Sequence, residues 1–326
     1  MPSENPYCIL NGVSAADANT AWAVGESDLG EGLILHTADG GATWTEQSMG
    51  ELAGFELYGV SFVDANAGTV VGQGIFMRTT DGGATWTSQW LGARLRGVSF
   101  VDANTGTVVG DPFYDVGTIL RTTDGGTSWT LLVAGANRVF LGVSFSDANT
   151  GWTVGERGTI LRTTDAGATW TPQSREWTPI YRFTALSFLD TLTGWAVGRA
   201  PSSTQPLPIL HTTDGGNTWM PQCSDAITGL SGVSFVDAYN GWAVGTVSFG
   251  VQPARIVHTN DSGNTWRTQL TSQRGLNGIW FVDANTGTVV GAQGTILHTT
   301  NGGRKMGVQK QRDARHSHGT RLRGQQ

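Results

Sequence analysis

The sequence is poor in the residue types that charged, disulfide-bonded and membrane-spanning proteins need. Only 14% of its 326 residues are charged, about half the usual share, which excludes a charge-rich disordered chain and a coiled coil. Two cysteines far apart in sequence, Cys8 and Cys223, give neither a disulfide framework nor a zinc-ligand spacing. No apolar run approaches the roughly 18 residues that span a bilayer, and residues 1–15 lack the pattern of a secretory signal. We therefore predict two unrelated thiols and no transmembrane segment; either the protein is cytoplasmic or its leader is missing from this sequence.

Lysine is almost missing, and its distribution divides the chain. Both lysines, Lys305 and Lys310, lie in residues 304–326, which hold seven basic residues and a single acid, Asp313. The preceding 303 residues therefore carry a formal charge of −12. An acidic body of this kind disfavours binding to a nucleic-acid backbone, so we expect no nucleic-acid partner.

A repeated unit, rich in glycine, occupies almost the whole chain. It reads G-V-S-F-x-D-A-N-x-G-W/T-x-V-G and then G-T-I-L-R/H-T-T-D-G-G-x-T-W, and it recurs seven times with a period of 38 to 47 residues. A fixed period of this size indicates a repeat architecture. The copies begin at Gly12, Gly59, Gly97, Gly142, Ala185, Gly232 and Gly278.

Each unit contains short β-branched or aromatic runs divided by turn residues, as at 98–101, 107–109 and 118–122, and a further run starts at the Trp after Asp-Gly-Gly. Such runs are typical of strands, and no segment has the period of a helix. Each unit is thus predicted to be a four-stranded antiparallel meander. A ring of units covers both faces of every sheet. We predict an all-β fold, a seven-bladed β-propeller over residues 1–303; a linear β-solenoid is the alternative.

An aspartate follows the first predicted strand of every unit. In most copies Ala-Asn-x-Gly comes next, so that the carboxylate can accept backbone N–H groups and Gly can supply a positive φ. We interpret these carboxylates as turn formers and not as an acid/base set. They are Asp17, Asp64, Asp102, Asp147, Asp190, Asp237 and Asp283.

The sharpest motif is T-x-D-x-G-x-x-W, which the chain contains in six complete copies. Its spacing suits a hairpin between the third and fourth strands, with the carboxylate in the turn and Trp packed between blades. The alternative, metal binding by these aspartates, is disfavoured because the copies fall on separate blades. The pairs are Asp39 and Trp44, Asp81 and Trp86, Asp124 and Trp129, Asp165 and Trp170, Asp214 and Trp219, and Asp261 and Trp266.

These residues resemble the Asp-box, also called the bacterial neuraminidase repeat. The fuller string, matched most closely from Gly151 to Trp170, is similar to the photosystem II stability/assembly factor family of seven-bladed propellers, over about residues 12–303. The resemblance implies an extracytoplasmic, periplasmic or lumenal assembly chaperone. It implies binding to a photosystem II reaction-centre subunit in a photosynthetic host, through a surface patch of arginines.

Binding residues are expected on the disc face opposite the Asp boxes, where the sequence carries its long insertions, at 26–31, 111–115, 199–208 and 246–254. Arginines gather there just before the innermost strands, and guanidinium groups on an acidic body suit a carboxylate, a phosphate or an acidic protein segment. The alternative is that each arginine pairs locally with Asp or Glu or caps a loop. These candidates for partner binding are Arg94, Arg96, Arg138, Arg182 and Arg274.

A second set of polar residues precedes each box by two or three positions. Some repeats have His at this position and others have Arg, which indicates a side chain that stacks or hydrogen-bonds between blades. The four histidines lie on separate blades, so they cannot bind one zinc ion together. We therefore expect no metal and no cofactor. The set is His36, Arg78, Arg121, Arg162, His211, His258 and His298.

Catalysis is the competing hypothesis, because Asp boxes also occur in sialidases and other glycosidases. A sialidase needs an arginine triad, a Tyr–Glu pair and an acidic proton donor. The segment Tyr181-Arg182-Phe183-Thr184 matches the family's Tyr/Phe-Arg-Ile-Pro motif poorly, and Asp111, Tyr114, Asp115 and Glu156 could supply acids and a phenol without any diagnostic spacing. We predict a non-catalytic, monomeric protein-binding scaffold; a glycosidase or glycan-binding propeller is the alternative.

The last repeat runs normally to Gly303 and then becomes RKMGVQKQRDARHSHGTRLRGQQ. If Arg304 to Gly307 is encoded CGN-AAR-ATG-GGN, reading one nucleotide later gives x-(Lys/Arg)-Trp, with Trp where the box requires it. We hypothesise that residues 304–326 are a frameshifted end; a genuine basic tail is the alternative. We also expect the seventh blade to be incomplete, because residues 1–11 are too few to add its fourth strand.

Overall fold

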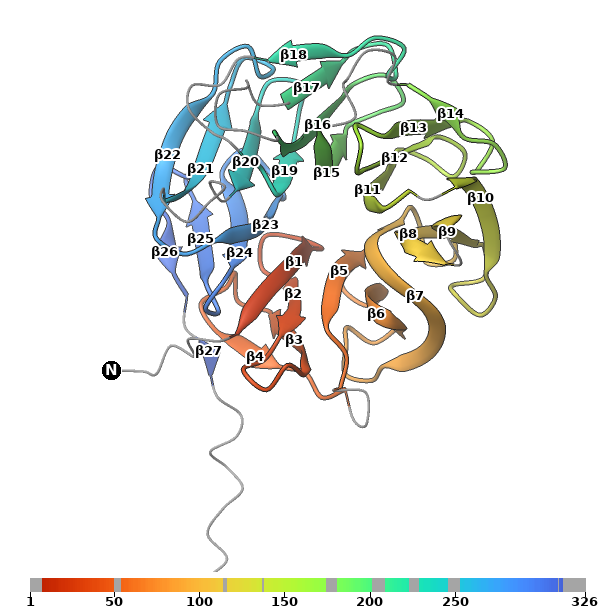
Figure 1. Cartoon of the computed structure of the whole chain (residues 1–326). Helices are drawn as coiled ribbons and strands as arrows, with labels where there is room; N and C mark the ends of the chain where they lie inside the picture. Colours follow the sequence, from red (N-terminus) through yellow and green to blue (C-terminus); the bar gives the residue numbers. More distant parts are fainter. Residues whose placement is uncertain are drawn as a thin grey trace, which may run out of the picture.

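The protein is a closed ring of antiparallel β-sheets (Figure 1). The computed structural model describes residues 8–49, 54–113, 116–136, 138–173, 181–200, 209–222, 229–245, 253–309 and 311–312. Every regular element in this part of the chain is a β-strand, which confirms the all-β prediction. The ring closes where Ile9 bridges to Ala292 and Gly294 N donates to Cys8 O at 2.8 Å. The alternative of a linear solenoid is therefore wrong.

The strands follow the repeats along the chain. The first sheet holds β1 (Ile9–Ala15), β2 (Ala21–Glu26), β3 (Gly32–Thr37), β4 (Trp44–Glu46) and β27 (Gln311–Arg312). The second holds β5 (Leu57–Phe62), β6 (Gly68–Thr79), β7 (Thr87–Phe100), β8 (Gly106–Phe113), β9 (Val116–Thr122) and β10 (Thr130–Ala136).

Four further sheets have four strands each. They are β11 (Phe140–Phe145), β12 (Gly151–Gly155), β13 (Ile160–Thr163) and β14 (Thr171–Pro172); β15 (Arg182–Phe188), β16 (Gly194–Arg199), β17 (Ile209–Thr212) and β18 (Met220–Gln222); β19 (Gly232–Phe235), β20 (Gly241–Gly245), β21 (Ala254–Thr259) and β22 (Arg267–Ser272); and β23 (Leu276–Phe281), β24 (Thr286–Gly291), β25 (Ile296–Thr300) and β26 (Gly307–Val308).

The number of sheets differs from the prediction: six hydrogen-bonded sheets are present where seven blades were expected. The second and third repeats share one sheet because β7 runs without a break from the fourth strand of the second repeat into the first strand of the third. β6 pairs with β5 through 68–72 and with β7 from Gln73 onward, and the second half of β7 pairs with β8. A very short reversal at Gly74, with φ of 78°, lets the backbone of β6 stay extended on both sides.

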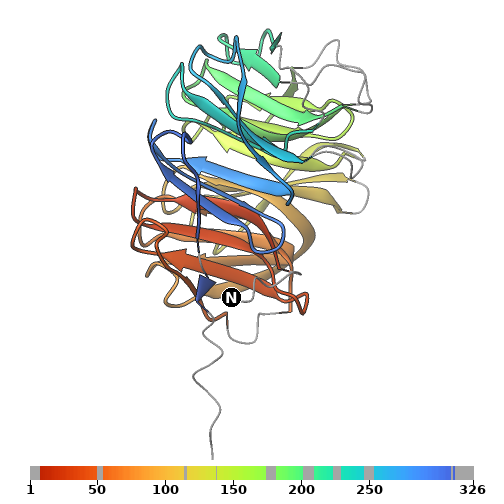
Figure 2. The same ribbon diagram turned by 90° about the vertical axis from the view of Figure 1, so that its left-hand side faces the viewer.

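The last sheet corrects a second expectation. It has a fourth strand, β26, so its strand count is complete. The box also persists in altered form: Asn301 Oδ1 accepts from Thr299 Oγ1 at 3.0 Å and from Lys305 N at 2.9 Å. Met306 stands in the place of the box Trp and packs on the neighbouring core. Beyond it, β27 crosses to the first sheet and pairs in parallel with β4 (Figures 1 and 2).

Contacts between successive repeats build the core. The Trp on a second strand stacks on the Phe that ends the next first strand, with ring centroids 3.4 Å apart for Trp22 and Phe62 and 3.5 Å for Trp195 and Phe235. The first strands are also linked around the axis, because Phe62 N donates to Ser14 Oγ at 3.1 Å. A Cβ on Gly142 would lie 3.0 Å from Thr184 O, a tight contact that glycine avoids where the first strands approach one another.

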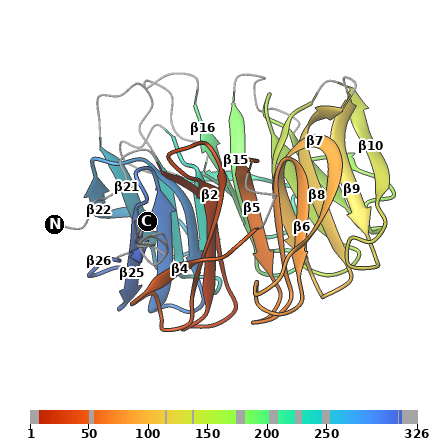
Figure 3. The same cartoon turned by 90° about the horizontal axis from the view of Figure 1, so that it is seen from below.

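Strand direction gives the disc two different faces (Figure 3). First strands run from one face to the other and second strands return. The turn aspartates and the Asp boxes therefore lie together on one face, which we call the Asp-box face. The starts of first strands and the ends of second strands lie on the opposite face, which we call the loop face.

Candidate functional site

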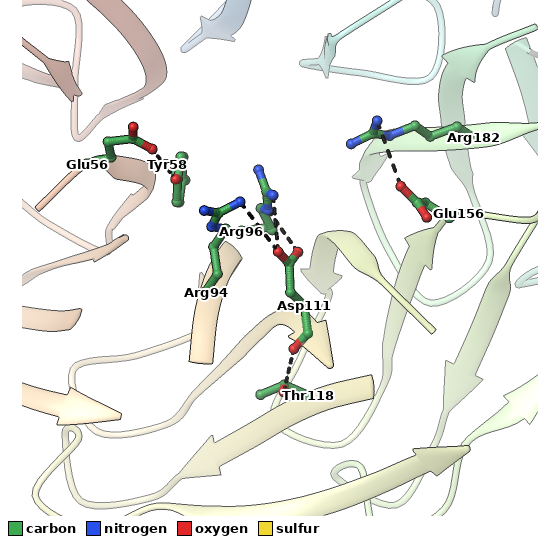
Figure 4. Close-up of polar contacts among 8 residues, drawn as sticks. All are labelled: Glu56, Tyr58, Arg94, Arg96, Asp111, Thr118, Glu156 and Arg182. Carbon is green, nitrogen blue, oxygen red and sulfur yellow. Dashed lines mark hydrogen bonds and ion pairs between the residues drawn. The ribbon is translucent and has the colours of Figure 1, made fainter. Parts of the chain in front are cut away.

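Charged side chains from several repeats meet on the loop face (Figure 4). Glu56 and Tyr58 stand at the start of β5, Arg94 and Arg96 lie where β7 enters the third repeat, and Asp111 follows in β8. Glu156 and Arg182 continue the series in the next two repeats. We call this set the loop-face network.

The strongest ion pair of the loop-face network joins Arg96 to Asp111. The Arg96 Nε and Nη2 donate to the two carboxylate oxygens of Asp111 at 3.0 and 3.2 Å, the paired geometry that suits a guanidinium and a carboxylate. Burial lowers the pKa of Arg96, but the hydrogen bond and charge of Asp111 outweigh it and the net shift is upward. Arg94 lies at 3.9 Å from the same carboxylate and keeps 44% of its side chain exposed. Asp111 therefore holds Arg96 firmly and Arg94 loosely.

Tyr58 and Glu56, at the start of the second repeat, connect this pair to Glu26 of the first repeat. The Arg96 guanidinium lies 4.9 Å from the centre of the Tyr58 ring, and the Tyr58 hydroxyl donates a short hydrogen bond to Glu56. Burial, followed by the bond to and charge of Glu56, raises the pKa of Tyr58 to about 12. The pKa of Glu26 is raised by burial and by the nearby carboxylate of Glu56. The phenol is thus held neutral beside an acidic pair.

Arg182 is paired more weakly. Its Nη1 lies 3.8 Å from Glu156 Oε1, and 46% of its side chain is exposed. Directly opposite it in the β15–β16 ladder lies a second arginine, Arg199, whose Nη2 donates to Ser231 Oγ at 3.2 Å. Burial and the like charge of Arg182 lower the pKa of Arg199. Two guanidiniums thus lie opposite each other, one facing a carboxylate at 3.8 Å and the other bound to a hydroxyl.

The remaining candidates are placed separately. Arg138 is exposed and donates through Nη1 to Thr159 Oγ1 at 2.8 Å, and the Arg274 backbone N donates to Ser272 Oγ at 3.1 Å. Tyr114, Asp115 and most of the predicted insertions at 199–208 and 246–254 lie outside the described residues. The structure thus brings Arg94, Arg96 and Arg182 beside carboxylates from neighbouring strands and repeats.

Sequence reasoning missed Glu56, Tyr58 and Arg199. Arg199 could have been found from the repeat alignment, because it ends the second strand directly opposite Arg182 in the antiparallel register. Glu56 and Tyr58 carried no such signal, since no other repeat has Glu or Tyr at the corresponding position.

The Asp boxes lie apart from one another on the other face. In each complete box the aspartate binds its own hairpin: Asp39 Oδ1 accepts from Thr43 N at 2.9 Å and Oδ2 from Thr43 Oγ1 at 2.6 Å. These bonds lower the pKa of Asp39, Asp81 and Asp124 to about 2, with the side-chain bond from Thr43, Thr85 or Ser128 as the largest cause. The box Trp side chains pack edge-on to Phe rings, as Trp86 does on Phe62 and Trp129 on Phe76.

The part of the chain that the structure describes contains no group of three or more His, Cys, Asp or Glu side chains placed to hold a metal ion. Within the same residues, no helix is long and apolar enough to cross a membrane.

The ring, its repeated boxes and its charged loop face together define an Asp-box β-propeller. The profile of the family described as photosynthesis system II assembly factor YCF48 matches residues 4–140 and 134–225, and the chain belongs to that family. No curated protein matches the sequence.

Solved structures share the fold. The structure of "YCF48 bound to D1 peptide" has a TM-score of 0.70 and 21% identity, covering 91% of this chain and 94% of that one. YCF48 from Cyanidioschyzon merolae has a TM-score of 0.68 and 22% identity, covering 92% and 97%. The GH74 enzyme of Niastella koreensis has a TM-score of 0.71 at 14% identity, covering 94% of this chain and 54% of that one. At these identities the likeness concerns the fold alone.

Proposed function

We propose that this protein is a photosystem II assembly factor that binds a protein partner on its loop face and catalyses no reaction. Family membership supports the assembly role. The observation that carries the binding site is the opposed pair Arg182 and Arg199: Arg182 lies 3.8 Å from the Glu156 carboxylate, and Arg199 donates to the neutral hydroxyl of Ser231. Like charges directly opposite each other in a sheet are unfavourable. An anionic group from a partner would relieve this repulsion.

The partner we propose is an extended segment of the D1 subunit, because a structural relative, YCF48, has been solved bound to a D1 peptide. A segment ending in or containing carboxylates would contact Arg182 and Arg199 and the exposed side of Arg94. Arg138 and Arg274 would lie further along the same face. Arg96 is held by Asp111, so we assign it a positioning role for the Tyr58 ring and Arg94.

A pull-down from host membranes tests this assignment. The bait is the full chain, compared with Arg94→Glu/Arg182→Glu, in which the two loosely paired arginines are reversed. The matched control is Arg267→Glu/Arg304→Glu, which reverses two exposed arginines on or beside outer strands. We expect D1 to be captured by the wild type and the control but not by the loop-face variant. Capture by all three forms contradicts the proposed site.

For the catalytic alternative, the two predicted acids that the structure describes, Asp111 and Glu156, both face arginines. Asp111 binds Arg96 through both oxygens, and Glu156 faces Arg182. Glycoside hydrolysis needs two carboxyl groups across a sugar-binding cleft, one of them a general acid with a raised pKa. We propose that the likeness to GH74 enzymes reflects the propeller alone. Release of sugar from xyloglucan or a sialoside by the purified chain would contradict this.

We also propose that the repeat is the packing unit, so that the β5–β10 sheet behaves as two blades and the ring as seven. In support, Phe100 N donates to Ser61 Oγ at 3.2 Å within that sheet, just as Phe62 N donates to Ser14 Oγ between separate sheets. The boxes would then act as architectural hairpins, one to a blade, and the chain as a monomer. An experimental structure and light scattering test these two points.

A further inference from the structure

The interfaces between successive repeats are of two kinds. At four of them the second strand carries a Trp whose Nε1 donates to a backbone carbonyl of the next box, as Trp22 does to Gly82 O at 3.1 Å. In three of these four, a Gln from the fourth strand donates to the same carbonyl, as Gln47 does to Gly82 O at 3.0 Å. Indole and amide together fill the space between the repeats.

The interface between the second and third repeats has neither donor. Thr69 stands in place of the Trp, and Arg78 occupies the vacated position, with its guanidinium 5.4 Å from the centre of Phe100. Gln89 stands in place of the bridging Gln, but it is exposed. The Phe76 ring takes the space that a bridging Gln89 side chain would need. It lies against Gly126, where a Cβ would come within 2.4 Å of the ring, whereas the equivalent glycine of the preceding interface, Gly83, lies against Gln47. Phe76 replaces an isoleucine found at this register in every other repeat.

The result is an open groove of about 600 Å³ between the second and third repeats, near the outer edge of the ring and on its Asp-box face. Its walls are the outer edge of β7 at 87–89 and the third box at 124–127. The corresponding hollow between the third and fourth repeats is about 280 Å³, and at the ring seam it is about 10 Å³. We call the largest one the rim groove.

The charges of the rim groove are satisfied internally. Arg78 donates to Thr69 Oγ1 and Ala103 O, and Asp124 accepts from Thr122, Ser128 N and Ser128 Oγ. Uncharged groups remain: the Gln89 amide, the Ser88 hydroxyl and the Gly125 carbonyl. Within the described residues, Gly125 O receives neither an indole nor an amide donor, unlike Gly82 O. A neutral ligand rich in N–H donors fits such walls.

We infer that the rim groove is a docking site for an extended peptide segment that carries a side-chain amide. The peptide backbone would pair with the open edge of β7 at 87–89, and a Gln or Asn side chain would donate to Gly125 O. The chain already uses this geometry at the equivalent register of the first repeat, where β27 pairs with Trp44 and Thr45 on the outer edge of β4. This site is separate from the loop face.

Fluorescence anisotropy with the full chain tests the inference. The probe is Gly-Thr-Val-Gln-Thr-Val-Gly-amide with fluorescein coupled to its N-terminal amine. Controls are the same peptide with Gln replaced by Met, which removes the amide, and with backbone N-methylation, which removes strand pairing. We expect saturable binding of the probe, and at least tenfold weaker binding of both control peptides.

Protein variants locate the site. Thr69→Trp restores the indole seen in four repeats, and Arg78 can then lie over it as Arg162 lies over Trp152. Phe76→Ile, a milder change, lets Gln89 bridge to Gly125 O. Each should weaken probe binding at least tenfold, whereas Thr288→Trp at the ring seam should change it less than twofold. Circular dichroism checks folding.

Three results would overturn the inference. One is no saturable binding of the probe to the wild type. Another is equal binding to the wild type, Thr69→Trp and Phe76→Ile. The third is binding of cellohexaose without binding of the peptide, since that result would make the groove a glycan site.

Discussion

The indole of Trp22 lies flat on the phenyl ring of Phe62, with centroids 3.4 Å apart and ring planes inclined by 3°. The same stack joins Trp152 to Phe188, Trp195 to Phe235 and Trp242 to Phe281. Because each indole also donates to the following box, one side chain fixes both the spacing and the rotation of neighbouring repeats. Where Trp is replaced by Thr, Arg78 and Arg121 take over the contact as cations above Phe rings.

Removing one of these stacks should be costly. Trp195→Ala deletes a fully buried side chain and leaves a cavity, so we expect the free energy of unfolding to fall by about 3–5 kcal/mol. Urea denaturation at pH 7 measures this. Trp280→Ala is the control, because Trp280 is 41% exposed and makes no such stack in the described residues. Equal losses in the two variants would show that the stack has no special role.

Stability should fall as the pH is lowered from 7 to 5. Burial lowers the pKa of His36, His211, His258 and His298. A lowered folded-state pKa means that the unfolded chain binds more protons, so the stabilisation is full above the ordinary value of about 6.5 and is lost as pH falls through the folded pKa. Urea midpoints at pH 7 and pH 5 measure the effect.

His211→Arg provides the matched control for that titration. Arg162 already occupies the same register over Trp152, 5.6 Å from the ring centre, so the fold accepts this residue there. The variant should show a smaller change in midpoint between pH 7 and 5 than the wild type. An unchanged difference would mean that His211 does not contribute to the pH dependence.

The boxes should control unfolding in stronger acid. The hydrogen bonds of Asp81, first that from Thr85 Oγ1, hold its folded pKa at about 2, below the ordinary value of 3.8. Its stabilisation is therefore present above pH 4 and lost as the pH falls toward 2. We expect Asp81→Ala to lower the melting temperature at pH 7 more than Asp81→Asn, since Asn301 fills this role in the last repeat. Equal melting temperatures would contradict this.

Restoring the last box should stabilise the ring. Asn301→Asp/Met306→Trp adds the second carboxylate oxygen and the aromatic ring that six other repeats have. We expect a melting temperature several degrees higher than that of the wild type, by calorimetry. Asn301→Asp alone is the control, and an equal value for the double variant would argue against a packing role at position 306. That residues 304–326 are a frameshifted end remains our proposal, and resequencing the codons for Arg304 to Gly307 tests it.

The repeat pattern was enough to predict strands, ring and boxes, because each unit carries its own turn residues. It could not predict that the second and third repeats share a sheet, since that depends on β7 staying extended and paired where the chain passes from one repeat to the next. It also suggested that the seventh blade was incomplete, whereas Asn301 keeps hydrogen bonds of the box turn and Met306 packs in the place of its Trp. The partners of the arginines were equally hidden, because Arg96 meets Tyr58 only when the first strands of the second and third repeats pack side by side.

The central claim is that the loop face binds an extended segment of D1. Its direct test is a calorimetric titration of the full chain with that D1 segment, at low and at high salt. We predict saturable binding to the wild type and to Arg267→Glu/Arg304→Glu, weakening as salt is raised because the contacts are ionic. Arg94→Glu/Arg182→Glu should weaken it at least tenfold. Unchanged affinity in that variant would contradict the account.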